Sequence, residues 1–337
     1  MKIGPINGLV LLGGGDILLE LSHWAKLTNL EVRVISSKRH ADEILSNNLS
    51  LRSSLLMNKT QLLEIEDIGS PDVITFLENG DYNWLYLSLS AAWIFKEKDI
   101  RSTFKNQLLN VHGTRLPTNR GGGGFSWQIM MGNRFGFSLI HKVDTGIDTG
   151  PIIKFEEYLY PNHCRIPRDF ESINKSKTID FLQEFIQGVR EGELVFDEIK
   201  QVEYLSTYWP RLNTKLNGWI DWQWPAHDIE KFILAFDDPY SGAQTFLNTK
   251  KVHLKSVCLS PQDAVFHPYQ SGLIYRTSRD WICVSLPGNS LIVENVLDEN
   301  GDSILRDIKI GDRFFTPSKL LEDSLSRVIY TPKGLKS

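Results

Sequence analysis

The first half of the chain alternates short apolar runs with stretches of helical periodicity, and this alternation constrains the fold most strongly. Apolar residues at helical spacing predict helices at 17–27 and 71–78. Apolar or alternating runs predict strands at residues 8–12, 31–35, 84–90, 107–112 and 137–143. Because strands separated by helices favour parallel pairing, we expect an α/β fold with a Rossmann-like, mostly parallel sheet covered by helices on both faces.

The second half changes character after a predicted helix at about residues 178–190. A short helix is predicted at 226–236, and β-type runs separated by Pro, Gly and Asn follow at 243–247, 251–259, 272–277, 281–286 and 290–297. Short strands of this kind predict a small OB-like barrel. The expected organisation is an α/β domain at 1–195, a linker at 196–215, and a β-rich, OB-like C-terminal domain at 216–337.

Composition excludes several classes of protein. The 337 residues suit two domains, and nine Trp with a net charge of only −4 exclude a disordered chain. A nucleic-acid binder gains no support, because Asp plus Glu (41) outnumber Lys plus Arg (37). No apolar run reaches the roughly 20 residues of a membrane-spanning helix, and residues 1–16 are interpreted as a first strand, not a signal peptide. Three widely spaced Cys predict a reducing cytoplasm, without disulfides or a zinc site.

A glycine-rich turn, Gly13-Gly14-Gly15, follows the first predicted strand, in the position of a dinucleotide-binding fingerprint. The pattern is not G-x-G-x-x-G, and no acidic residue for a ribose follows the second strand. We therefore interpret it as a tight strand-to-helix turn with Asp16 as the helix cap, and not as a nicotinamide or flavin site. A phosphate at the N-terminus of the following helix stays open.

The segment Asn110–Pro151 carries the chemistry. Asn110 and His112 are two residues apart at a strand end, so their side chains point to the same side, where open α/β sheets bind ligands. An imidazole can move a proton, and an amide N–H can stabilise an oxyanion, as attack on a carbonyl requires. Asp148 follows the next strand and could orient the histidine. Each residue alone is more often structural, but their combination at consecutive strand ends favours a catalytic site.

The motifs of this segment resemble those of the formyltransferases that use 10-formyltetrahydrofolate, which act on methionyl-tRNA, glycinamide ribonucleotide or amino sugars. The matching motifs are Asn110-Val111-His112, Leu116-Pro117, Arg120-Gly121 and Asp144-x-Gly146-x-Asp148-x-Gly150-Pro151. The resemblance continues at 216–246, which is similar to the start of the C-terminal domain of methionyl-tRNA formyltransferase. It therefore implies a one-carbon transferase whose co-substrate is 10-formyltetrahydrofolate and which needs no metal.

The resemblance implies roles for matching residues. Asn110, His112 and Asp148 would be the catalytic triad, in which His112 either stabilises the oxyanion or accepts the amine proton. The pterin would be held by a cofactor-binding set of Ile94, Phe95, Asp144, Thr145, Gly146 and Ile147. For Ile94 and Phe95, core packing is an equally good interpretation. His141 lies on the strand that leads to the loop and is left outside the triad as a structural residue.

The residues expected on the acceptor side differ from those of methionyl-tRNA formyltransferase. This acceptor-side set is Arg115, Gly122, Gly123, Gly124, Phe125 and Trp127. The glycines are either a flexible loop or an anion site made of backbone N–H groups, and Trp127 could stack on a nucleotide base. Tyr208 and Trp209 are interpreted as linker packing.

These differences, and the absence of a basic insertion after the second strand, favour a small acceptor. The leading hypothesis is an amino sugar carried as a dTDP or UDP derivative for surface polysaccharide (O-antigen) synthesis. The alternatives are methionyl-tRNA formylation, a deformylase, and a module that binds formyltetrahydrofolate without turnover. We further expect a cytoplasmic protein without a membrane partner, and a homodimer.

Overall fold

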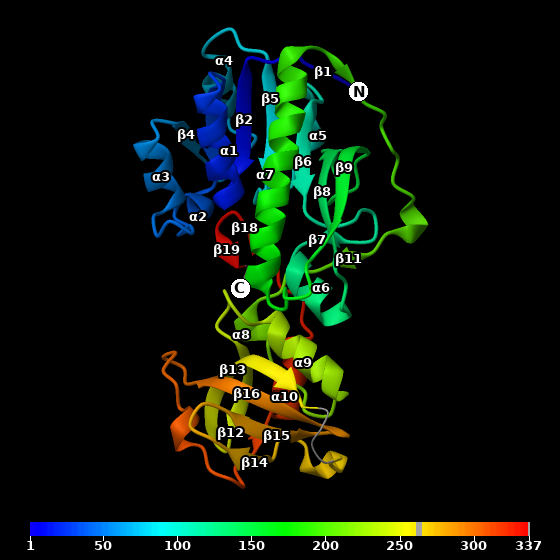
Figure 1. Cartoon of the computed structure of the whole chain (residues 1–337). Coiled ribbons are helices and arrows are strands. Elements are labelled where there is room, and N and C mark those ends of the chain that lie inside the picture. The colour runs from blue at the N-terminus through cyan, green and yellow to red at the C-terminus, as the bar shows by residue number, and fades with distance from the viewer. Residues whose placement is uncertain (261–264, 336–337) are drawn as a thin grey trace.

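The computed structural model describes residues 1–260 and 265–335, in which an α/β part lies above a β-rich C-terminal part (Figure 1). The α/β part is built on a seven-stranded sheet of order β4-β3-β2-β5-β6-β8-β9. Pairing is parallel from β4 to β6, whereas β8 is antiparallel to both β6 and β9. The strands are β2 (Gly8–Gly13), β3 (Glu31–Ser36), β4 (Gln61–Glu64), β5 (Trp84–Leu89), β6 (Leu108–His112), β8 (Phe135–Lys142) and β9 (Ile152–Leu159).

Helices cover both faces of this sheet, as the sequence predicts. In β2, Leu9 and Leu11 join the core beneath α1 (Asp16–Leu27) and α7 (Pro167–Glu191), while Val10 and Leu12 join the core on the opposite face with α4 (Pro71–Glu78) and α5 (Glu97–Ser102). Period-2 alternation in a strand that is apolar throughout therefore supplies two cores at once. Two short helices, α2 (Lys38–Ala41) and α3 (Leu51–Met57), precede β4.

Some local predictions were wrong. Strand β4 was not predicted, because its four residues are exposed or half-buried and give a weak sequence signal. Helix α7 begins at Pro167, ahead of the predicted start. Asp16 does not cap α1; the N-cap is Gly15, with φ 88°, and the Asp16 carboxylate instead accepts a hydrogen bond from Ser46 Oγ at 2.6 Å.

Short segments connect the two parts. Strand β7 (Arg120–Gly121) pairs in parallel with β11 (Tyr208–Trp209), so the predicted linker is fixed to the α/β part. Helix α6 (Gly124–Met131) packs on α9 (Ala226–Ala235), and Ile129 belongs to the C-terminal core. The remaining short elements here are β1 (Lys2–Ile3), β10 (Leu194–Val195), η1 (Glu203–Leu205) and α8 (Thr214–Asn217).

The C-terminal part is a curled antiparallel sheet of order β14-β15-β16-β13-β12-β17. Its edges approach each other, since Phe314 N donates to Gly272 O at 2.8 Å. It forms a half-barrel, and the OB topology itself stays a prediction. The strands are β12 (Ala243–Leu247), β13 (Lys250–Leu259), β14 (Ile274–Thr277), β15 (Ile282–Leu286), β16 (Asn289–Leu297) and β17 (Phe314–Phe315), with the short helices η2 (Pro268–Gln270) and η3 (Leu305–Asp307).

The C-terminal segment returns to the α/β part. After α10 (Ser318–Ser324), the hairpin β18 (Tyr330–Thr331) and β19 (Gly334–Leu335) lies beside the lower end of the sheet in Figure 1. An ion pair of 3.1 Å between Lys333 and Glu66 connects the hairpin to that end. Within the described ranges, no helix combines the length and the apolar character needed to cross a membrane.

Candidate active site

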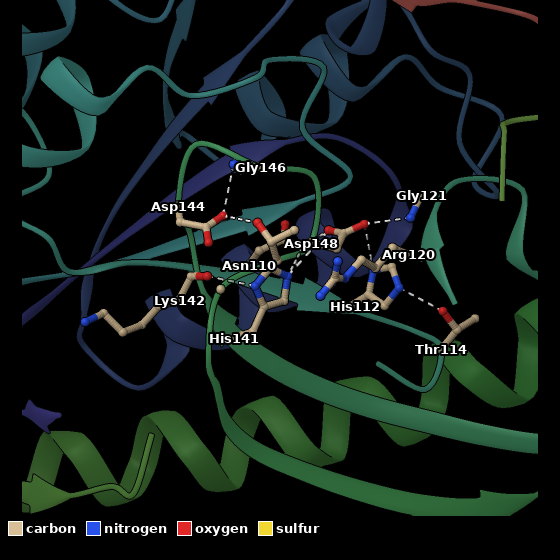
Figure 2. A network of polar contacts seen from close by, with 12 residues as sticks. Asn110, His112, Thr114, Arg120, Gly121, His141, Lys142, Asp144, Gly146 and Asp148 are labelled. Atoms are coloured by element: carbon tan, nitrogen blue, oxygen red, sulfur yellow. Dashed lines mark hydrogen bonds and ion pairs between the residues drawn. The ribbon is translucent and has the colours of Figure 1, made fainter. Parts of the chain in front are cut away.

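The carboxyl end of β6 and the loop after β8 bring Asn110, His112 and Asp148 together (Figure 2). Asn110 Nδ2 lies 3.4 Å from Asp148 Oδ1, and His112 Nδ1 lies 3.8 Å from Asp148 Oδ2. The side chains of His112 and Asp148 are 11% and 14% exposed. An amide, an imidazole and a carboxylate therefore meet in a mostly buried place, where electrostatic interactions are stronger than in water.

The backbone fixes the Asp148 carboxylate. Asp148 adopts φ 54°, a left-handed conformation that Asp tolerates better than most residues. Its Oδ2 accepts a hydrogen bond of 2.9 Å from the amide of Gly121, whose own φ is 97°. The Gln201 amide group donates to the carbonyls of Asp148 and Gly150 at 2.8 and 2.7 Å. Two other segments of the chain, those of Gly121 and Gln201, thus position this carboxylate and its loop.

The pKa of Asp148 lies well below its usual range. Burial alone would raise this pKa, but the charge of His112, the hydrogen bond and charge of His141, and the Gly121 N–H together outweigh burial. The carboxylate is therefore charged at neutral pH.

Hydrogen bonds define which nitrogen of His112 can react. His112 Nε2 lies 2.8 Å from the carbonyl oxygen of Asn119 and 2.8 Å from the hydroxyl of Thr114. Because a carbonyl only accepts, Nε2 must carry a proton. The Thr114 hydroxyl donates to the same carbonyl at 3.0 Å. Nδ1, on the side of Asp148, is therefore the nitrogen left to gain or lose a proton.

His141 joins the site although the sequence interpretation left it outside the triad. It lies opposite Asn110 in the β6–β8 register, and its Nε2 is 3.0 Å from Asn110 Nδ2 and 3.5 Å from Asp148 Oδ1. Its Nδ1 donates to Lys142 O at 2.8 Å. Thr114, Gly121 and Gln201 were also missed. For His141 the sequence held a signal, because it lies on the strand that leads to the Asp148 loop. Only the cross-strand register, however, shows that His141 pairs with Asn110.

The expected pterin-binding residues divide into two groups. Asp144 closes its own loop, since its carboxylate accepts from Gly146 N at 3.0 Å and from the Thr149 hydroxyl. Thr145 and Ile147 are exposed, and their amide N–H groups have no acceptor within the part of the chain that the structure describes. Figure 2 shows this loop beside the triad.

The two apolar residues after β5 behave differently from each other. Phe95 is buried in the core that Val143 also contacts, whereas the Ile94 side chain is 68% exposed. The free backbone amides of Thr145 and Ile147, together with the exposed Ile94 side chain, suit a flat heteroaromatic ring with polar edges.

The acceptor-side residues lie around the β7–α6 turn. Gly123 caps α6 with φ 73°, and a Cβ on Gly122 would lie 3.1 Å from Arg211 Cβ. A Cβ on Gly124 would lie 2.9 Å from the methyl group of Thr114. Arg115 is exposed. Phe125 packs against the C-terminal core, and the ring of Trp127 lies 5.0 Å from that of Trp209. Within residues 1–260 and 265–335, no group of His, Cys, Asp or Glu could hold a metal ion.

Comparisons with known proteins point to one family. Residues 213–305 match the family described as formyl transferase, C-terminal domain. The chain is 28% identical over 192 residues to the methionyl-tRNA formyltransferase of Desulfotalea psychrophila, and the match covers 57% of each protein. Together these matches support a formyltransferase family for the chain. It matches little more than half the length of that relative.

Solved structures share the fold of this chain. The sugar 3N-formyl transferase WlaRD, crystallised in the presence of dTDP and 5-N-formyl-THF, has a TM-score of 0.63 at 20% identity, covering 85% of this chain and 97% of that one. The Helicobacter canadensis N-formyltransferase, in complex with folinic acid and dTDP-3-aminofucose, also has a TM-score of 0.63 at 20% identity, covering 85% and 98%. Both likenesses extend beyond the α/β part into the C-terminal half.

Proposed function

We propose that this protein is an N-formyltransferase that moves a formyl group from 10-formyltetrahydrofolate to the amine of a nucleotide-linked amino sugar. The observation that carries the proposal is the convergence of Asn110, His112 and Asp148 at the carboxyl end of the sheet. Similarity to formyltransferases, in the family match at 213–305 and over 192 residues of the methionyl-tRNA formyltransferase relative, supports it. A cytoplasmic location and a homodimer stay predictions.

The chain's own groups suit this reaction. When bound, 10-formyltetrahydrofolate supplies a formyl carbon for attack by a neutral amine. Asn110 Nδ2 donates to the oxygen that gains negative charge. His112 Nδ1 accepts the proton that the amine loses, and the charged Asp148 stabilises the resulting imidazolium. His112 then returns this proton to the nitrogen that leaves as tetrahydrofolate when its bond to the formyl carbon breaks. Thr145 and Ile147 would hold the pterin through their free backbone amides, with the Ile94 side chain against the ring.

The acceptor is proposed from charge and from similar structures. The chain carries a net charge of −4, which disfavours a polyanionic RNA ligand. Two sugar N-formyltransferase structures, each with dTDP or a dTDP-sugar, share its fold. A second candidate, formylation of methionyl-tRNA, is favoured by the name of a curated relative. The deformylase remains a third, since the same site could pass the formyl group to water.

An acceptor panel tests these candidates. The protein is incubated with 10-formyltetrahydrofolate and, separately, with dTDP- and UDP-linked amino sugars, charged initiator tRNA, or no acceptor, and tetrahydrofolate release is followed. We expect release with an amino-sugar nucleotide. Release only with tRNA would establish the second candidate, release without an acceptor would indicate the deformylase, and no release in any arm would refute formyl transfer.

Two histidine variants provide a matched pair for this assay. His112→Ala should lower the rate by roughly 10²- to 10⁴-fold, the usual contribution of a general acid or base. His163→Ala removes an exposed histidine in the turn before α7 and should leave the rate unchanged. Equal activity of the two variants would remove His112 from the mechanism.

A further inference from the structure

A cavity of about 810 Å³ lies between the two parts of the molecule. Its walls come from α6, the segment 208–212, the region around α9, and the C-terminal segment 321–328. None of the triad residues lines it. Its volume is within the range of small-molecule sites, roughly 300–1,000 Å³, so the cavity is large enough for a second portion of a ligand.

Aromatic rings in fixed orientations line this interdomain cavity. Trp127 donates from Nε1 to Pro210 O at 2.9 Å, and Trp219 stacks on Phe246 with ring centroids 5.7 Å apart and planes at 9°. Trp224 packs edge-on against Phe232. Rigid indole faces at an accessible cavity favour a planar ring as ligand, because stacking there costs little conformational entropy.

The cavity is lined by the carboxylates of Asp221, Asp228 and Glu322 and by the guanidinium groups of Arg211 and Arg327, and Glu322 lies on the same C-terminal segment as Arg327. Asp221 and Asp228, on the C-terminal part, have no ion-pair partner within the described ranges. Arg211 and Arg327 come from the linker and the C-terminal segment. A ligand with an N–H donor near Asp221 and Asp228 and negative charge near Arg211 would match this arrangement.

Arg211 connects the cavity to the ligand-binding edge of the sheet. Its guanidinium lies 4.9 Å from the centre of the Tyr330 ring. Arg211 is also close enough to His40 for its charge to act there: burial first, then the charges of Arg39 and Arg211, lower the pKa of His40 to about 4. A Cβ on Gly14 would lie 2.8 Å from His40 Cβ, so His40 packs against the turn after β2. Two strand spacings of about 4.8 Å separate the ends of β2 and β6, so about 10 Å lies between this turn and the triad.

The cavity wall and the triad also share one segment. Gly121 N donates to Asp148 Oδ2 at 2.9 Å, and Gly121 pairs with Trp209. Gly122 N donates to Trp209 O at 3.0 Å, and α6, which carries Trp127, begins two residues later. A ligand that contacts both the cavity and the triad would therefore contact a single continuous stretch of the chain.

We propose that this cavity holds the nucleoside diphosphate portion of the acceptor, with the base between the indole rings, its single ring N–H facing the carboxylates of Asp221 and Asp228, and Arg211 contacting the diphosphate. The inference rests on the proposed function and extends it. Arg211, beside both the cavity and the carboxyl edge of the sheet, would hold the phosphates while the sugar amine extends to the triad.

Nucleotide binding without folate tests the site separately from catalysis. Titration calorimetry with dTDP and UDP should show binding to the wild-type protein. Arg211→Ala should weaken it by about tenfold or more, as expected for one lost charge-assisted contact. Ser326→Trp, at an exposed position on the cavity wall, should abolish it by filling the space. Arg279→Ala, an exposed arginine outside the cavity, is the matched control and should bind like the wild type.

The outcomes separate the two proposals. No binding of either nucleotide, or binding that Arg211→Ala and Ser326→Trp leave unchanged, would overturn the nucleotide site, even if formyl transfer occurs. His112→Ala should bind the nucleotides with wild-type affinity. If the predicted binding is found but no amino-sugar nucleotide is formylated, the site stands and the proposed function fails.

Discussion

The Asp148 carboxylate lies 3.8 Å from Nδ1 of His112, and both side chains are mostly buried. The other carboxylate oxygen lies 3.5 Å from Nε2 of His141, so one negative charge serves two imidazoles. This arrangement holds the pKa of Asp148 well below its usual range. It therefore makes the folded state prefer a deprotonated Asp148.

Asp148→Asn should remove a pH-dependent part of the stability. The folded pKa of Asp148 is depressed below an unfolded value of about 3.9, so the unfolded state binds the proton more readily. The stabilisation is therefore fully present above about pH 4 and is lost as the pH falls towards the folded pKa. Urea unfolding at pH 7 should show a loss of roughly 1–3 kcal/mol in the variant, and the difference should shrink near pH 3.5. A difference that does not change with pH would contradict the charge assignment.

Thr114→Val should impair catalysis by releasing His112 rather than by removing a reacting group. The variant loses the hydroxyl that lies 2.8 Å from His112 Nε2 and donates to Asn119 O. We expect kcat to fall by about tenfold, as for a net loss of about 1 kcal/mol or more, with a displaced pH–rate profile and an unchanged KM for folate. Thr114→Ser keeps the hydroxyl and should restore the wild-type profile. If Val and Ser behave alike, Thr114 has only a packing role.

Local pattern was sufficient to predict five of the seven strands of the sheet, all but β4 and β9, and to single out Asn110, His112 and Asp148 as candidate site residues. The apolar runs at β2 and β5 are buried throughout, and burial on both faces is what makes such strands recognisable in sequence. Asn110 and His112 could be placed on one side because the period of a strand is fixed. Their roles, like those of the cofactor and acceptor residues, stay proposals.

Contacts between distant segments could not be predicted. His141 meets Asn110 only through the β6–β8 register, and no spacing within one strand defines that register. Gly121 reaches Asp148 because β7 pairs with β11, nearly 90 residues away along the chain. The interdomain cavity needs four segments at once. Each depends on tertiary packing, which periodicity does not encode.

His40→Gln should make the protein less sensitive to mild acid. His40 is buried, its Nδ1 has no hydrogen-bond partner within the described residues, and its folded pKa of about 4 lies below the ordinary 6.5. Between pH 6.5 and 4 the unfolded state binds the proton first, so falling pH favours unfolding by up to roughly 3 kcal/mol. Thermal unfolding of the wild type should lose stability across this window, and His40→Gln should lose less. The exposed His163→Gln is the control and should follow the wild type; equal slopes in all three proteins would rule out His40 as the source.

Gly121→Ala should disturb the site more than a substitution at an equally strained but open glycine. A Cβ at Gly121, with φ 97°, would lie 2.3 Å from the carbonyl oxygen of Trp209, so the β7–β11 pairing would have to open. That opening would withdraw the Gly121 amide from Asp148 and lower both activity and stability. Gly301, with φ 89°, has open space at the same position, so Gly301→Ala carries the backbone strain of about 1–2 kcal/mol alone. Measured side by side, the two variants should lose stability by different amounts, and only Gly121→Ala should lose formyl transfer. Activity retained in Gly121→Ala would show that the amide of Gly121 is not needed to position Asp148.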